Sequence, residues 1–163
     1  MRAVSNTSPI SNLAAIGRLS LLQAQCTELW IPSAVSQELA AHPDPATRAA
    51  IQTALDEQWI QIAHPAATPL LKVLLLQLHA GEAEAIALAT DIKADMVIID
   101  EQEGRQLAVQ SGLPITGVLG ILLRAKQRGQ IAALQPEIQS LREKARFFIA
   151  SSLEARVLSA AGE

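Results

Sequence analysis

The run Met96-Val97-Ile98-Ile99 limits the possible folds of this chain more than any other feature. All four of its residues are apolar, and Asp100 ends it. A strand with one face in water alternates apolar and polar residues, whereas a strand buried on both faces is apolar throughout. The run therefore predicts a strand of a parallel sheet that is covered by helices on both faces.

Strand-like and helix-like segments alternate along the rest of the chain. Further strands are expected at residues 3–5, 28–31, 59–62 and 114–116. Helices are expected near residues 8–16, 19–22, 33–39, 46–55, 70–78, 82–89, 101–111, 118–128, 136–144 and 152–160. Ser8 is expected to cap the first helix, with Pro9 at its first position. The alternation favours an α/β fold, and 163 residues are most simply one domain, residues 1–163.

Composition excludes several classes of protein. Hydrophobic residues make up 50% and charged residues 18%, which excludes intrinsic disorder. The aromatic content of 2% argues against a platform for stacking bases. A single cysteine, Cys26, and three scattered histidines argue against a disulfide framework or a zinc site. No signal peptide or membrane span is expected, because the uncharged stretch 106–123 is broken by Pro114 and three glycines. We therefore expect a cytoplasmic protein.

The charge is unevenly distributed. The net charge is −3, yet residues 105–146 carry seven cations and only two acids. A basic face beside an acidic cluster is compatible with phosphate chemistry at a metal site. The alternative is a solvated helix surface without a ligand.

Four oxygen-bearing side chains fall where a parallel sheet places its ligands. Asn6 follows the first expected strand, Asp100 follows the apolar run, and Glu38 and Glu82 lie in two helices. Sites in such sheets form outside the carboxyl ends of the strands. Oxygen donors that converge there would hold a hard cation such as Mg²⁺ or Mn²⁺, because clustered carboxylates repel one another without one.

Each of these residues also has a purely structural interpretation. The structural interpretation of Glu38 is an exposed helix carboxylate, that of Asp100 a helix cap, that of Glu82 a first-turn acid and that of Asn6 a turn residue. Glu82 and Glu84 point to different sides of a largely apolar helix. Because burying an unpartnered carboxylate is costly, we expect at least one of the two to lie at a polar site.

Five segments, taken in order, resemble PIN-domain proteins of the compact prokaryotic kind related to VapC-type toxins. They are Ser5–Pro9, Ile31–Leu39, Gly81–Ala89, Ala94–Asp100 and Gly117–Lys126, the last of which resembles the C-terminal signature of one PIN subgroup. The resemblance covers essentially the whole chain. It implies a three-layer α/β/α domain around a parallel sheet of about five strands, with C-terminal helices from about residue 134 packing on it or on a partner.

The resemblance also implies a function. A PIN domain of this kind would be a metal-dependent endoribonuclease that hydrolyses RNA phosphodiester bonds, the toxin of a type II toxin–antitoxin pair blocked by a small antitoxin. Asn6, Glu38, Glu82 and Asp100 take the family's four acidic positions, as catalytic residues and ligands of Mg²⁺ or Mn²⁺, with Glu101, Thr7 and Ser8 as accessory groups. Candidate contacts to the RNA backbone are Arg105, Arg124, Lys126 and Arg128.

One departure from the family pattern leaves a second function open. The family's first acid is usually Asp, and the neutral amide of Asn6 is expected to bind a metal more weakly. The chain would then be a PIN-like partner-binding or regulatory module. A nucleotide-binding flavodoxin-like domain ranks third, because no glycine-rich phosphate loop is present. Residues 70–78 carry few charges and are either core or a surface for a homodimer or an antitoxin.

Overall fold

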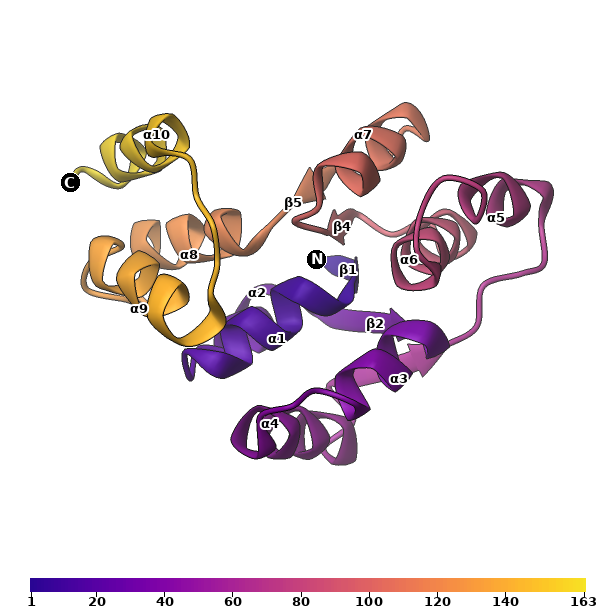
Figure 1. The fold of residues 1–163 in the computed structure, drawn as a ribbon, viewed down its shortest axis with the longest axis horizontal. Coiled ribbons are helices and arrows are strands. Elements are labelled where there is room, and N and C mark those ends of the chain that lie inside the picture. Colours follow the sequence, from indigo (N-terminus) through magenta and orange to yellow (C-terminus); the bar gives the residue numbers. More distant parts are fainter.

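The central sheet has five parallel strands in the order β3-β2-β1-β4-β5, in a computed structural model that describes residues 1–163. The strands are β1 Arg2–Ser5, β2 Glu28–Pro32, β3 Ile60–Ala63, β4 Met96–Ile98 and β5 Ile115–Thr116. Helices cover both faces of the sheet (Figure 1). The expected three-layer α/β/α fold with a parallel sheet is therefore confirmed.

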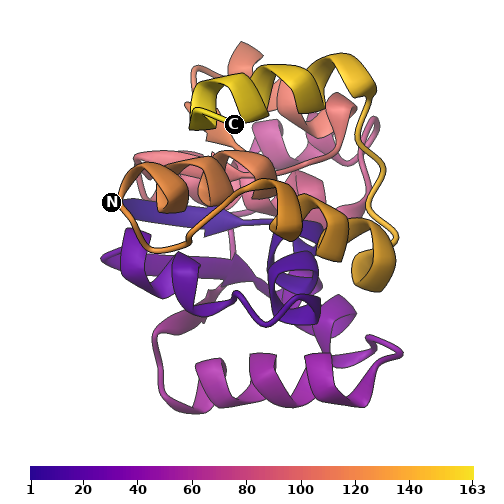
Figure 2. The same ribbon diagram turned by 90° about the vertical axis from the view of Figure 1, so that its left-hand side faces the viewer.

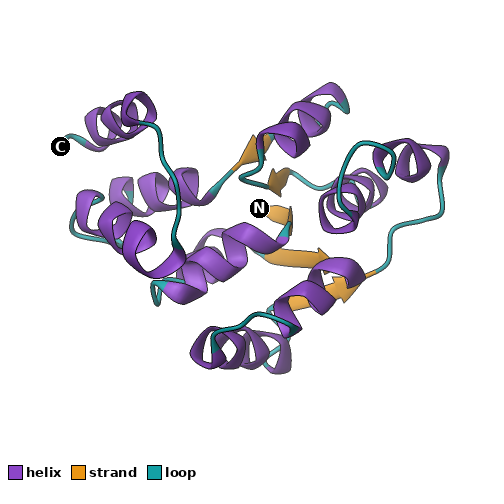
Figure 3. Cartoon of the chain, viewed as in Figure 1, coloured by secondary structure: helices purple, strands orange, loops and turns teal.

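Ten helices connect and extend the strands (Figure 3). They are α1 Thr7–Ala15, α2 Ser20–Gln25, α3 Ser33–Ala40, α4 Pro45–Asp56, α5 Pro69–Leu74, α6 Ala80–Asp91, α7 Gln102–Gln110, α8 Val118–Gln127, α9 Gln135–Ala145 and α10 Ser151–Ala161. None of them is both long enough and apolar enough to cross a bilayer.

The start of α1 differs from the sequence expectation. The sequence predicts Ser8 as the cap, but the N-cap residue is Asn6, and the helix begins at Thr7. The backbone N–H of Asn6 donates to the carbonyl of Ile98 at 3.0 Å, so the chain is still paired with β4 at that residue and turns into the helix directly afterwards. A contact between distant segments, which local capping preferences do not reveal, sets this boundary.

The order of the strands places a crevice at the carboxyl ends of β1 and β4. From β1 the chain moves outward through β2 to β3, and it then returns to the other side of β1 to form β4 and β5. Ser5 pairs with Ile98, so these two strands end side by side. In doubly wound sheets this reversal point is where ligands bind.

Both faces of β1 and β4 are buried, which explains the apolar run. Ala3 and Ile98 belong to a core cluster of 26 buried residues contributed mainly by α1, α2, α3, α4, α8 and α9. Val4, Val97 and Ile99 belong to a second cluster on the other face, beneath α6. Burial of apolar area stabilises these strands from both faces, at about 25 cal/mol per Å².

The last two helices are tied to the rest of the fold. α10 packs against α8, as Figure 2 shows. Arg142 of α9 forms an ion pair with Glu154 of α10. The side chain of Glu163 accepts hydrogen bonds from the backbone N–H groups of Leu134 at 2.6 Å and Gln135 at 3.0 Å, at the start of α9.

The leucine-rich segment 70–78 is shorter as a helix than expected. α5 ends at Leu74, and turns follow it. Leu74 and Leu78 are buried in a small cluster with α6 and α7, whereas Leu75 and Leu76 are exposed. The segment is therefore partly core and partly apolar surface.

Candidate functional site

Asn6 joins the ends of the two central strands. Asn commonly caps a helix with its own side chain, but Asn6, at the N-cap of α1, makes no such bond. Its Nδ2 instead donates to Oε2 of Glu101 at 2.9 Å. Asn6 is almost fully buried, and Glu101 follows β4 as the N-cap residue of α7. The side chain available for a local cap is thus committed to a long-range contact at the crevice.

Glu38 reaches the same place from α3. The hydroxyl of Thr7 donates to Oε2 of Glu38. A Cβ atom on Gly81 would lie 2.9 Å from Oε1 of Glu38 and 3.2 Å from Oδ1 of Asn6. These two oxygens therefore occupy the space above Gly81, which is open only because this residue has no side chain.

Glu82 is buried in the first turn of α6. Its Oε2 accepts a hydrogen bond from the backbone N–H of His79 at 3.3 Å. Burial raises the pKa of Glu82, and the nearby charge of Glu101 raises it further, while the His79 N–H only partly opposes the two effects. The raised pKa marks a carboxylate that a neighbouring cation would stabilise.

These residues line one cleft of about 400 Å³ in which every lining residue is polar or charged. α1 and the residue before it contribute Asn6, Thr7, Ser8 and Ser11, and other elements contribute Glu38, His79, Glu82 and Glu101. The hydroxyl of Ser8 is buried and has no hydrogen-bond partner. Four elements thus bring three carboxylates and an amide to the reversal point of the sheet.

Asp100 lies apart from this cleft. Its Oδ1 accepts a hydrogen bond from the backbone N–H of Val118 at 2.9 Å, so it caps the start of α8. Burial raises its pKa to about 6, and the Val118 N–H and the charge of Arg105 only partly oppose this shift. Consecutive residues that leave a strand point to opposite sides. Glu101 therefore faces Asn6 in the cleft, whereas Asp100 does not line it.

The comparison with known families decides the identity of the fold. A family model described as a PIN domain matches residues 2–163. The chain belongs to the PIN-domain family. No curated protein matches it.

Glu84 positions one of the acidic residues of this PIN domain. It accepts hydrogen bonds from the backbone N–H of Ala34 at 3.1 Å and the hydroxyl of Ser33 at 3.4 Å, at the start of α3. α3 carries Glu38, so Glu84 fixes the helix from which Glu38 enters the cleft. Both Glu82 and Glu84 therefore lie at polar sites, which explains two carboxylates on an otherwise apolar helix.

Only one of the four cations expected to contact substrate lies at this edge of the PIN domain. Arg105 donates to the carbonyl of Ile99 at 2.8 Å, beside Asp100. α8 starts beside Asp100, at Val118, and runs back along the sheet. Arg124 therefore lies near the sulfur of Met1, at the opposite end of β1. Lys126 donates to the carbonyl of Ala132, and Arg128 comes two residues after Lys126, at the end of α8. The structure does not bring Arg124, Lys126 or Arg128 to the cleft, because a helix rises about 1.5 Å per residue away from its start.

The donor set of the PIN cleft suits a divalent cation by its chemistry. Carboxylate and amide oxygens are the ligands that Mg²⁺ and Mn²⁺ prefer. Glu38, Glu82 and Glu101, with Oδ1 of Asn6, supply them at the cleft. No three acidic, histidine or cysteine side chains are placed to hold one ion together. The cleft carboxylates accept hydrogen bonds from Thr7, His79 and Asn6. Coordination would require these side chains to exchange such bonds for the metal.

Proposed function

We propose that this PIN domain is a metal-dependent endoribonuclease that hydrolyses RNA phosphodiester bonds. The observation that carries the proposal is the all-polar cleft, in which Asn6, Glu38, Glu82 and Glu101 converge from four elements at the reversal point of a parallel sheet. A buried Glu82 with a raised pKa beside Glu101 supports a cation as the missing partner of these carboxylates.

Each proposed ligand has a residue that positions it. Thr7 holds the Glu38 carboxylate, the His79 N–H holds Glu82, and Asn6 holds Glu101. A bound Mg²⁺ or Mn²⁺ would supply an activated water and would stabilise negative charge on the phosphate. Asp100 serves the site indirectly in this proposal, because it fixes the start of α8 next to Glu101.

We further propose that the enzyme is the toxin of a type II toxin–antitoxin pair, inhibited by a small antitoxin protein. The support for this is the resemblance to VapC-type proteins. An apolar surface for the antitoxin or for a second copy of the chain is offered after α5, where Leu76 is 84% exposed and Leu75 lies beside it.

The direct test is RNA hydrolysis in Mn²⁺ by the wild type and by Glu82→Gln. We expect EDTA to stop cleavage by the wild type. The substitution is expected to lower the rate by at least about 100-fold, because a cation loses a charged ligand. Glu57→Gln, at the exposed C-cap of α4, is the matched control and should cleave at the wild-type rate. Equal rates for wild type and Glu82→Gln would contradict the proposal.

A second candidate function is favoured by Asn6. A neutral amide in place of the family's usual acid, together with the absence of three acids arranged around one point, fits a PIN-like module that binds a partner without cleaving RNA. Titration calorimetry with Mn²⁺ distinguishes the two functions. Heat of binding that Glu82→Gln abolishes supports the enzyme, and no binding at millimolar Mn²⁺ supports the module.

A further inference from the structure

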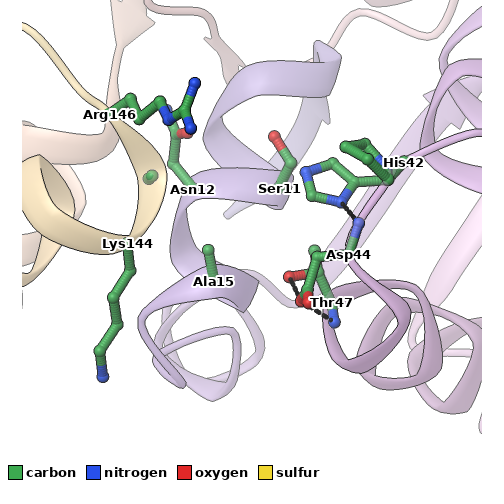
Figure 4. A pocket seen from close by; sticks show the side chains of 10 residues that line it. Ser11, Asn12, Ala15, His42, Asp44, Thr47, Lys144 and Arg146 are labelled. Carbon is green, nitrogen blue, oxygen red and sulfur yellow. Dashed lines mark hydrogen bonds between the residues drawn. The ribbon is translucent and has the colours of Figure 1, made fainter.

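A second hollow, of about 650 Å³, lies next to the acidic cleft. It is bounded by α1, by the turn between α3 and α4, and by the end of α9 (Figure 4). Its volume falls within the range of pockets that hold small molecules. None of its lining residues was among the candidates from the sequence, and the proposed chemistry of the cleft does not use it.

The hollow adjoins the acidic cleft at one residue. Ser11 of α1 lines both of them. Asn12, the next residue, lines the hollow and also lies beside Asp100, whose pKa it helps to lower. A strand of RNA whose reacting phosphate lies at Glu82 would therefore have an adjoining phosphate or nucleotide near Ser11.

The charge of the hollow is opposite to that of the cleft. Arg146 and Lys144 line it, both are exposed, and neither takes part in any ion pair of the molecule. Its only acid is Asp44, whose carboxylate accepts hydrogen bonds from the N–H of Thr47 at 2.8 Å and from its hydroxyl at 2.6 Å. Asp44 keeps its charge but forms an ion pair with neither cation, so the two cations outnumber the one acid in the hollow.

Hydrogen-bond donors lie on opposite walls. Figure 4 shows Arg146 beside Asn12 on one wall, His42 beside Ser11 on the other, and Lys144 extending away at the rim. Nδ1 of His42 accepts from the backbone N–H of Asp44 at 3.2 Å, which leaves Nε2 of a neutral ring as a donor. The Arg146 guanidinium and the His42 imidazole N–H are donors that suit phosphate oxygens, whereas the hydroxyl of Ser11 already donates to the carbonyl of Ser8 at 3.1 Å.

Arg146 is held in this place by an unusual backbone conformation. It is the C-cap residue of α9, with φ 52° and ψ 33°, in the left-handed region that glycine usually occupies at a helix end. A non-glycine residue in this region is uncommon, and Gln58 and Lys93 are the others in this chain. The cation therefore stands at a position where the backbone alone would favour Gly.

We propose that this hollow binds a backbone phosphate of the RNA strand that enters the acidic cleft. The inference rests on the proposed ribonuclease function and adds to it a phosphate subsite made by Arg146 and His42, with Lys144 at the rim. The subsite would orient the strand and offset the repulsion between RNA and the carboxylates of the cleft.

The backbone of Arg146 provides a variant that tests the subsite without endangering the fold. Arg146→Gly removes the cation and places at this position the residue that its conformation favours. Lys93→Gly is the matched control: Lys93 also has φ 52° and is exposed, but it precedes β4 at the opposite end of the sheet. Each variant loses one positive charge and relieves one left-handed residue, so their comparison isolates the location of the charge.

The measurement is the affinity for a fluorescein-labelled single-stranded RNA in EDTA, by anisotropy, over a range of salt concentrations. We expect Arg146→Gly to weaken binding about 5- to 10-fold at low salt and to reduce the slope of log K against log salt by about 0.7, the value for one phosphate contact to a single strand. Lys93→Gly should match the wild type. In the wild type, adenosine monophosphate should shift the NMR amide signals of Ser11 and Asn12.

The possible results separate this inference from the proposed function. Identical affinity and slope for Arg146→Gly and Lys93→Gly would overturn the subsite, even if RNA is cleaved in Mn²⁺. Binding of RNA that depends on Arg146 would support the subsite, even if no cleavage is found. Binding of an acidic peptide but not of RNA, with loss in Arg146→Gly, would overturn the phosphate assignment and indicate a protein partner instead.

Discussion

Nδ2 of Asn6 lies 2.9 Å from Oε2 of Glu101 and links the ends of β1 and β4 across 95 residues of sequence. An aspartate at position 6 would have no proton to donate, and its charge would repel that of Glu101. Asparagine thus stabilises the cleft without a cation, whereas aspartate would stabilise it only with one.

The substitution Asn6→Asp separates these two roles. In EDTA we expect the free energy of unfolding to fall by about 1–3 kcal/mol, because a hydrogen bond to a charged group is lost and two carboxylates come together. In Mn²⁺ we expect tighter metal binding than in the wild type and a larger rise in Tm. Urea unfolding and calorimetry test both parts. Equal Mn²⁺ affinity in the two proteins would contradict the expectation.

Glu101 should matter more for cleavage than Asp100. Glu101→Gln can still accept the bond from Asn6 but loses a charged ligand, so we expect cleavage in Mn²⁺ to fall by at least about 100-fold with an unchanged fold. Asp100→Asn can still accept the bond from Val118 and should lower the rate less. Initial rates and circular dichroism provide the comparison, and a larger loss for Asp100→Asn would restore that residue as the principal ligand.

Asp100 should make stability depend on pH. Its pKa rises from 3.8 to about 6 on folding, because burial disfavours the charged form. The folded protein therefore binds more protons than the unfolded chain, and stability should fall as the pH rises from about 4 to about 6 and then level off. At pH 7.5 in EDTA, Asp100→Asn should be more stable than the wild type by at most about 3 kcal/mol. If the free energy of unfolding from urea titrations changes equally with pH in the two proteins between pH 4 and pH 8, this expectation is wrong.

Gly81→Ala should damage the site while sparing the fold. The new Cβ would lie 2.9 Å and 3.1 Å from the two carboxylate oxygens of Glu38, which must then move. Alanine favours a helix over glycine by up to about 1 kcal/mol, so Tm should not fall. We expect slower cleavage in Mn²⁺ together with equal or higher Tm. If the effect acts through Glu38, the double variant Gly81→Ala, Glu38→Gln should cleave RNA no more slowly than Glu38→Gln alone.

Glu84→Ala should lower the stability of the fold and leave metal binding intact, the opposite of Gly81→Ala. Loss of the bonds to Ala34 and Ser33 removes a cap from α3 and is expected to cost about 1–2 kcal/mol in urea unfolding. Glu57→Ala, which is exposed, should change stability by less than about 0.5 kcal/mol. Metal affinity measured well below Tm should be retained. A cost for Glu84→Ala no greater than that of the control would show that the cap is unimportant.

The sequence was sufficient for the fold because its strongest signals are local. The all-apolar run at residues 96–99 and the alternation of strand and helix patterns predict a parallel sheet covered on both faces, as the structure has it. The start of α1 was less accessible, since Asn6 and Ser8 are both good capping residues. The pairing of Asn6 with Ile98, far away in the sequence, decides between them.

The candidate site was only partly accessible for the same reason. The sequence indicates that an acid follows β4, but the choice between Asp100 and Glu101 depends on which side of the sheet each one faces. That choice is visible only through the bonds to Val118 and Asn6. The hollow at Arg146 was not predictable, because α1, the turn before α4 and the end of α9 meet there only in the folded chain.

The first turn of α6 has a consequence for any attempt to transplant this cleft. Gly81 leaves room for Glu38, Glu82 enters the cleft, and Glu84 fixes the start of α3. One residue inserted directly after Glu84 would rotate all three by about 100° around the helix axis relative to the buried remainder of α6. The segment Gly81–Glu84 must therefore be transplanted together with α3 and with the spacing to the rest of α6 unchanged.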